Sequence, residues 1–60
     1  MNITLTIHQS GNLRALSLNR RTWIAEIFCS GQWHRVGTGL YSSPVKAIAA
    51  AWRTRAQAAV

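Results

Sequence analysis

The sequence predicts an α+β fold, in which a three- to four-stranded antiparallel sheet carries one C-terminal α-helix packed on one face. Apolar and polar residues alternate strictly over 3–8, the pattern of a strand that is buried on one side only. A second run, 22–29, is rich in the aromatic and β-branched residues that strands favour. The segment 45–58 consists mainly of good helix formers. The 60 residues are expected to make one domain, with an N-terminal hairpin over 1–18 and a sheet-plus-helix unit over 20–58.

The first hairpin is expected to join strands over 3–8 and 13–18. Residues 10–12, which read Ser-Gly-Asn, supply the turn between them, because Gly and Asn tolerate positive φ. Residues two apart share a face of a strand, so one side of this hairpin should be apolar. The side chains expected to point inward from it are Ile3, Leu5, Ile7, Leu16 and Leu18.

The strand over 22–29 has two different faces. Its wholly apolar phase, which should face the core, consists of Trp23, Ala25, Ile27 and Cys29. The opposite phase places Ile24 and Phe28 on either side of the charged Glu26, so this face is not an ordinary solvent surface. Because an exposed apolar strip often marks a protein interface, Ile24 and Phe28 are candidates for one.

A partner strand over 32–38 follows a two-residue turn at 30–31, which reads Ser-Gly. Trp33 and Arg35 share one side of this strand, with Val36 on the other. Trp33 is therefore the tryptophan best placed for a surface contact, where stacking on a base is worth about 1–3 kcal/mol.

The helix has a clear start signal. Ser43 can cap its free amide groups, and Pro44 is favoured at the first helical position. The apolar residues at helical spacing, which should share the inward face, are Val45, Ile48, Ala49, Trp52, Ala56 and Ala59. Together with the strands they predict a core of Ile3, Leu5, Ile7, Leu16, Leu18, Trp23, Ile27, Val36, Ile48 and Trp52.

The charge balance indicates a polyanionic partner. Seven Lys and Arg residues face one acidic residue, Glu26, which gives a net charge of +6. Such a balance repels further copies of the chain and attracts polyanions. Nucleic acid is the leading partner class, followed by an acidic protein or an anionic membrane. Arginines, which make up six of the seven cations, favour planar, bidentate contact with phosphate or guanine.

Several function classes are not expected. With Glu26 as the sole carboxylate side chain, acid–base catalysis by a carboxylate pair is impossible, and the chain is not expected to be an enzyme. His8, Cys29 and His34 lack the paired spacing of a zinc site, so no metal or cofactor is expected, and Cys29 is expected to be a small core residue. No apolar run approaches a membrane span, and the start lacks the marks of a signal peptide. A location in the cytoplasm, of the producing cell or of a host, fits best.

Part of the chain resembles a known family. The series Trp-Ile-Ala-Glu-Ile at 23–27, Arg-Val-Gly-Thr at 35–38 and Tyr-Ser-Ser-Pro-Val-Lys-Ala at 41–47 precedes an Ala-rich helix. Over residues 20–58 this resembles the Apetala-type (ethylene-response-factor) DNA-binding domain and its phage and integrase N-terminal relatives. The resemblance implies that the exposed sheet face enters the major groove of DNA. Carried over by position, the DNA face would contain Arg20, Thr22, Glu26, Phe28, Trp33 and Arg35.

A shorter likeness concerns the second half alone. Gly-Thr-Gly at 37–39, Ser-Ser at 42–43 and Lys46 before an Ala-rich helix are similar to the end of a double-stranded RNA-binding domain. That likeness implies that a basic residue at the start of the helix grips phosphates across a groove.

The leading hypothesis is a small basic nucleic-acid-binding module, with duplex DNA favoured over RNA. Its phosphate contacts are expected from Arg20, Arg21 and Arg35, with Trp33 stacking and Lys46 meeting phosphate at the helix start. The alternative is a small phage-type accessory or inhibitor protein. It would bind an acidic or nucleoprotein host complex, such as a host-defence or transcription complex, through the same face. A homodimer formed through an exposed strand edge is compatible with either hypothesis.

Overall fold

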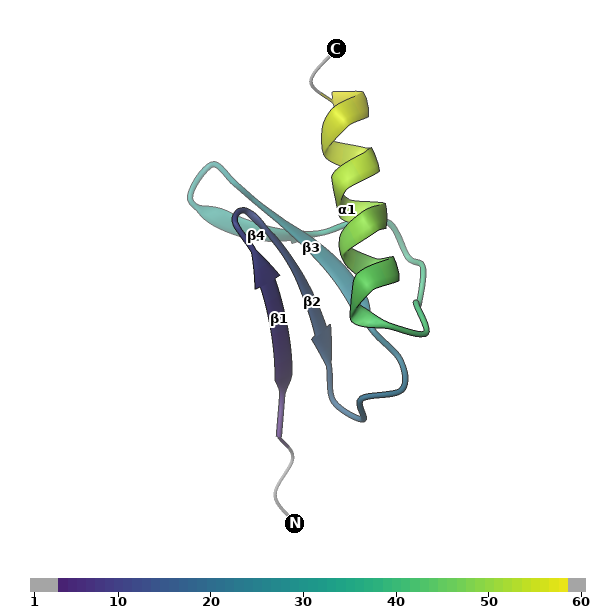
Figure 1. Cartoon of the computed structure of the whole chain (residues 1–60). Coiled ribbons are helices and arrows are strands. Elements are labelled where there is room, and N and C mark those ends of the chain that lie inside the picture. Colours follow the sequence, from purple (N-terminus) through teal and green to yellow (C-terminus); the bar gives the residue numbers. More distant parts are fainter. Residues whose placement is uncertain (1–3, 59–60) are drawn as a thin grey trace.

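A computed structural model of the chain describes residues 4–58. Its elements are β1 (Thr6–Ser10), β2 (Leu13–Ser17), β3 (Ile24–Cys29), β4 (Gln32–Arg35) and α1 (Pro44–Ala58). The four strands form one antiparallel sheet in the order β1-β2-β3-β4, and α1 lies across the side of the sheet that faces the viewer in Figure 1. The predicted α+β architecture is confirmed, with four strands and one C-terminal helix.

Both predicted hairpin turns are confirmed. Gly11 follows β1 with a φ of 60°, a left-handed conformation that glycine adopts without steric cost. Between β3 and β4, Ser30 and Gly31 have φ values of 54° and 78°. Two consecutive positive φ values are the mark of a type I′ turn, whose twist matches that of the flanking strands.

The start of α1 is tied to the start of β3. The hydroxyl of Ser43 accepts a hydrogen bond from the amide of Lys46 at 3.2 Å, which confirms the predicted cap, and Pro44 is the first helical residue. Just before the cap, Trp23 and Tyr41 form an isolated antiparallel bridge, with N–H···O distances of 2.8 and 2.9 Å. This bridge anchors the connection that carries the chain from β4 to the helix.

The core between α1 and the sheet is built mainly from small side chains. Its buried members are Leu13, Ala15, Trp23, Ala25, Val36, Ala47 and Ala51, with Ile27, Tyr41 and Ile48 packed at its margin. Ala15 of β2 lies opposite Ala25 of β3, and both are fully buried. Alanines on the sheet and on the helix let the two layers approach closely, and the larger side chains close the core around them. The predicted core positions of Trp23, Ile27, Val36 and Ile48 are confirmed.

The predicted inward phase of the first hairpin is wrong. Leu5 and Ile7 are about half exposed, and Leu18 is 67% exposed. Ile7 pairs with Leu16 on the sheet face away from α1, whereas β2 buries Leu13, Ala15 and Ser17 against the helix. Both phases of β2 contain leucine, so alternation alone could not decide between them; Ala15 decides, because only a small side chain fits beneath α1. Ile3 lies outside the described residues.

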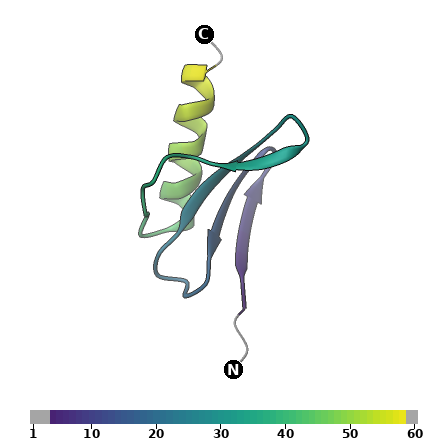
Figure 2. The ribbon, with the colours of Figure 1, turned by 180° about the vertical axis from the view of Figure 1, so that it is seen from behind.

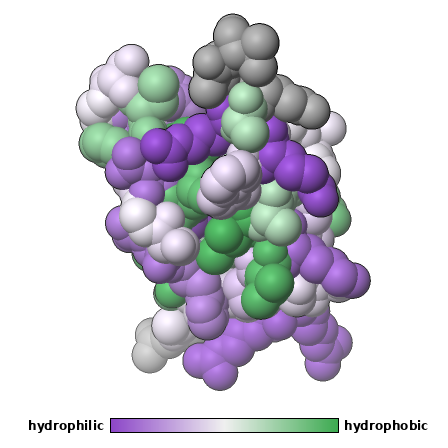
Figure 3. Space-filling view, turned by 45° about the horizontal axis from the view of Figure 1, so that its top comes forward, coloured by the Kyte–Doolittle hydropathy of each residue, from purple (hydrophilic) through white to green (hydrophobic). Residues whose placement is uncertain are grey.

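The predicted inward face of the helix is wrong as well, except at Ile48. Trp52 is 61% and Val45 75% exposed, and the helix instead buries Ala47, Ala50 and Ala51. Figure 3 shows hydrophobic surface in the middle of the face it views, bordered by hydrophilic side chains. Hydropathy favoured the stripe with the largest apolar side chains, but the short distance between helix and sheet selects the alanine stripe. Ala59, also predicted to lie inward, is outside the described residues.

Cys29 is exposed and therefore not the core residue that the sequence predicts. It is the last residue of β3, next to the turn at 30–31. Here the hairpin extends beyond the cover of the helix, so the inward phase of the strand ends at solvent.

Candidate functional site

One face of the sheet carries no covering layer among the described residues. Seen from behind, β4 and the rest of the sheet lie in front of α1 (Figure 2). We call this surface the open face. The strand register arranges its side chains in rows across the sheet, namely Ile7, Leu16 and Ile24, then Gln9, Arg14, Glu26 and Arg35, then Phe28 and Trp33. One end of the open face is therefore apolar, and the rest combines charge with aromatic rings.

The centre of the open face is a cluster of four side chains from three strands. Arg14 of β2 binds Glu26 of β3 through Nε and Nη2, each 2.6 Å from Oε1. The same guanidinium lies 4.1 Å from the ring centroid of Trp33 on β4. Phe28 meets the Trp33 ring edge-on, with a centroid distance of 5.3 Å. We call Arg14, Glu26, Phe28 and Trp33 the Arg14 cluster.

The sequence interpretation missed Arg14, although the sequence contained a signal for it. Arg14 and Leu16 are two residues apart, so a strand that turns Leu16 inward also turns Arg14 into the core. A buried arginine needs a carboxylate partner, and the chain has only Glu26 to offer. Reversing the phase of the strand would have placed Arg14 on the face of Glu26, where the structure has it.

The Arg14 cluster changes what Trp33 can do. Trp33 lies on the open face, as predicted, and is half-buried. One face of its ring is covered by the Arg14 guanidinium. A base that stacks on Trp33 therefore has only the opposite ring face available.

Arg20 and Arg21 lie in the loop between β2 and β3, at the end of the sheet near the start of α1 (Figure 1). The Trp23–Tyr41 bridge is antiparallel, so the residues before Trp23 run beside those after Tyr41. Lys46 follows in the first turn of α1, where its Nζ donates to the Ser42 hydroxyl at 3.2 Å. We call Arg20, Arg21 and Lys46 the basic end; all three are exposed.

The loop of the basic end is held by two polar side chains. The buried hydroxyl of Ser17 donates to the carbonyl of Thr22 at 2.7 Å and accepts from the amide of Arg20 at 2.8 Å. The side-chain oxygen of Asn19 accepts from the amides of Arg21 and Thr22 at 2.8 and 2.9 Å. Arg20 adopts a positive φ of 62°, so the loop is tightly turned at this residue.

The predicted contact residues thus fall into two groups. Trp33 and Arg35 lie on the open face, whereas Arg20, Arg21 and Lys46 form the basic end. The interface candidates Ile24 and Phe28 lie on the open face too, with Ile24 half-buried and Phe28 more exposed. Beside Ile24, a shallow apolar hollow of about 250 Å³ is lined in part by Leu5, Leu16 and Leu18.

Glu26 is the only carboxylate side chain in the sequence, and its partner is Arg14. No carboxylate side chain therefore remains for Arg35 or for the basic end. Among residues 4–58, no three His, Cys, Asp or Glu side chains come together as metal ligands do. Nor does the described part of the chain contain a helix long and apolar enough to cross a membrane.

Comparisons of the chain with protein-family models, curated proteins and solved structures found no match. Its surfaces must therefore be interpreted from their own chemistry.

Proposed function

We propose that the chain is a small basic nucleic-acid-binding module that favours duplex DNA and contacts phosphates through arginines. The basic end and Arg35 supply the phosphate contacts, and Trp33 lies beside them on the open face. The proposal includes a cytoplasmic location, where a DNA partner is accessible.

The observation that carries this proposal is the basic end. Arg20 and Arg21 are more than twenty residues from Lys46 in sequence, yet both segments flank the Trp23–Tyr41 bridge. Lys46 also lies in the first turn of a helix, where free amide groups and the helix dipole attract anions. Three exposed cations without a carboxylate side chain nearby are suited to a phosphate backbone.

A matched pair of double variants tests the role of the basic end. We expect the Arg20→Ala/Arg21→Ala protein to bind a 20-base-pair duplex more weakly. The slope of log affinity against log salt should also fall in magnitude by about 1.8, which is 0.9 for each lost phosphate contact.

The control is Arg53→Ala/Arg55→Ala. It also removes two positive charges, but from the C-terminal half of α1, outside the basic end. Of these two arginines, Arg55 lies in the last turn of the helix, where it favourably meets the dipole. Equal losses of affinity and slope in the two double variants would assign binding to net charge alone and contradict a specific role of the basic end.

The alternative function is favoured by a different observation, the exposed apolar side chains on the open face. Leu5, Ile7 and Phe28 are each about 40–50% exposed there, which a nucleic-acid backbone does not require. We propose as the alternative that the chain is a phage-type accessory or inhibitor protein. Its apolar strip and the neighbouring arginines would bind an acidic or nucleoprotein host complex.

Two single variants distinguish these functions in a co-purification from host lysate with and without nuclease. If the partner is nucleic acid, Arg35→Ala should reduce recovery more than Phe28→Ala, and nuclease should abolish it. If the partner is a protein, Phe28→Ala should have the larger effect, and recovery should survive nuclease.

A further inference from the structure

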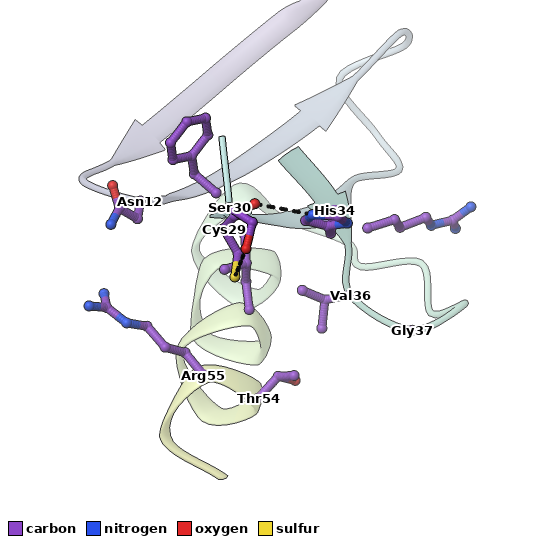
Figure 4. Close-up of a pocket in the computed structure, with 11 residues that line it drawn as sticks. Asn12, Cys29, Ser30, His34, Val36, Gly37, Thr54 and Arg55 are labelled. Carbon is purple, nitrogen blue, oxygen red and sulfur yellow. Dashed lines mark hydrogen bonds between the residues drawn. The ribbon is translucent and has the colours of Figure 1, made fainter. Parts of the chain in front are cut away.

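A groove of about 710 Å³ lies on the helix side of the sheet, between the β3–β4 hairpin and the C-terminal half of α1 (Figure 4). It exists because α1 packs against β2 and β3 and leaves the helix side of β4 largely uncovered. The buried Val36 and the half-buried Ile27 supply apolar lining, and α1 contributes Thr54 and Arg55. We call this space the hairpin groove; its lining does not include any residue of the basic end.

The charge of the hairpin groove has one sign. Its charged lining residues are Arg35 and Arg55, and no carboxylate side chain lines it. Glu26, the single carboxylate side chain, lies on the open face in its pair with Arg14. An occupant that combines apolar side chains with carboxylates would complement this lining, whereas a second copy of a chain with a net charge of +6 would be repelled.

The free edge of β4 borders the same groove. The amide of Val36 donates a hydrogen bond to the carbonyl of Ala25 at 2.8 Å, so the backbone amide of Val36 faces β3. Antiparallel pairing alternates, which turns the amide and carbonyl groups of Trp33 and Arg35 away from β3. Among the described strands, β4 is the last in the sheet, so these groups are open to a further strand.

We infer that the hairpin groove and the β4 edge together dock an extended acidic segment of a partner protein, which adds to the sheet as a fifth strand. Side chains alternate along an added strand, so every second one enters the groove and should be apolar. The other side chains face the open-face side of β4, where a carboxylate meets Arg35, and a carboxylate at the end of the segment that reaches α1 meets Arg55. This inference does not depend on DNA binding, although Arg35 of the open face also lines the groove and is shared with the proposed phosphate contacts.

The test uses a synthetic octapeptide of alternating leucine and glutamate, capped at both ends. The peptide is added at about ten times the dissociation constant of its complex with the protein. Hydrogen exchange of the Trp33 and Arg35 amides should then slow about tenfold, because only the small unbound fraction of the protein exchanges. Alkylation of Cys29 should slow as well, because this single, exposed cysteine lines the groove. An octapeptide of alternating leucine and lysine should leave both rates unchanged.

Two variants of α1 provide a matched comparison. Arg55 lines the hairpin groove and Arg53 does not, although both are exposed on the same helix. We expect Arg55→Glu to weaken binding of the glutamate peptide about fivefold and Arg53→Glu to change it less than about twofold. Because both positions are exposed, neither variant should impair folding.

Three results would overturn the inference. The first is amide exchange and alkylation rates that the glutamate peptide leaves unchanged. The second is exchange of the Trp33 and Arg35 amides that, without peptide, becomes slower as the protein concentration rises. That result would mean that the β4 edge pairs with a second copy of the chain. The third is equal protection by a DNA duplex, which would make the groove part of a nucleic-acid surface.

Discussion

Ser17 is the residue on which the loop of the basic end depends. Its side chain is buried. The hydroxyl donates a hydrogen bond to the Thr22 carbonyl and accepts one from the Arg20 amide. Removing such a hydroxyl leaves these groups without a partner in a site that water reaches poorly.

We therefore expect Ser17→Ala to lower the free energy of unfolding by about 1–2 kcal/mol, measured by urea denaturation. Ser42→Ala is the control, because Ser42 is exposed, and it should change stability by less than about 0.5 kcal/mol. Equal stabilities of the two variants would show that the hydroxyl of Ser17 does not hold the loop.

Arg14 has a different role, because it fastens three strands on a face that no other layer covers. Its side chain is 22% exposed and that of Glu26 15%, so their ion pair is better shielded from water than a surface pair. The guanidinium also gains a cation–π contact with Trp33.

Replacing Arg14 with Met keeps most of the apolar stem but removes both interactions. We expect Arg14→Met to lower the free energy of unfolding by about 1–2 kcal/mol, whereas Arg35→Met, at an exposed position of the same row, should have almost no effect. If Arg35→Met is the more destabilising of the two, the Arg14 cluster does not support the sheet.

At the scale of elements, the close approach of α1 to the sheet governs the fold. Ala51 is fully buried between the two layers, whereas Ala49, two positions earlier, is exposed. The space around a buried alanine in this position is already filled by the opposing layer.

A larger side chain should therefore be tolerated at position 49 but not at position 51. We expect Ala51→Leu to destabilise the protein by about 1–3 kcal/mol through overpacking, and Ala49→Leu to stay within about 0.5 kcal/mol of the unaltered protein. Thermal unfolding followed by circular dichroism measures both, and a tolerated Ala51→Leu would contradict the packing.

The elements themselves could be predicted from the sequence because their signals are local. Glycine turns, the Ser43 cap and alternation over β3 each act within a few residues, and all three are present in the structure. Which face of an element turns inward depends instead on the other layer. Hydropathy predicts that Trp52 and Leu18 point inward, but both are exposed, because a core built on Ala15 and Ala51 has no room for them.

The same distinction applies to the candidate site. The shared face of Trp33 and Arg35 follows from strand alternation, so it could be predicted. The Arg14 cluster depends on the register between three strands, and the hairpin groove depends on where α1 leaves the sheet. Neither is encoded in a short stretch of sequence.

The whole molecule is an elongated, positively charged body. Its longest dimension is 44 Å, which corresponds to about 13 base pairs of DNA at 3.4 Å each. A duplex of about 20 base pairs is therefore long enough to hold one copy. With one carboxylate side chain against seven cations, repulsion within the protein favours a polyanionic partner that neutralises the excess.

The most direct test of nucleic-acid binding is the salt dependence of the unaltered protein on such a duplex. Fluorescence anisotropy gives the affinity between about 50 and 200 mM salt, the range over which counterion release is readily measured. With about four phosphates contacted, by Arg20, Arg21, Arg35 and Lys46, the slope of log affinity against log salt should be near −3.6. A slope near zero, or no binding at the lowest salt, would contradict the proposed function.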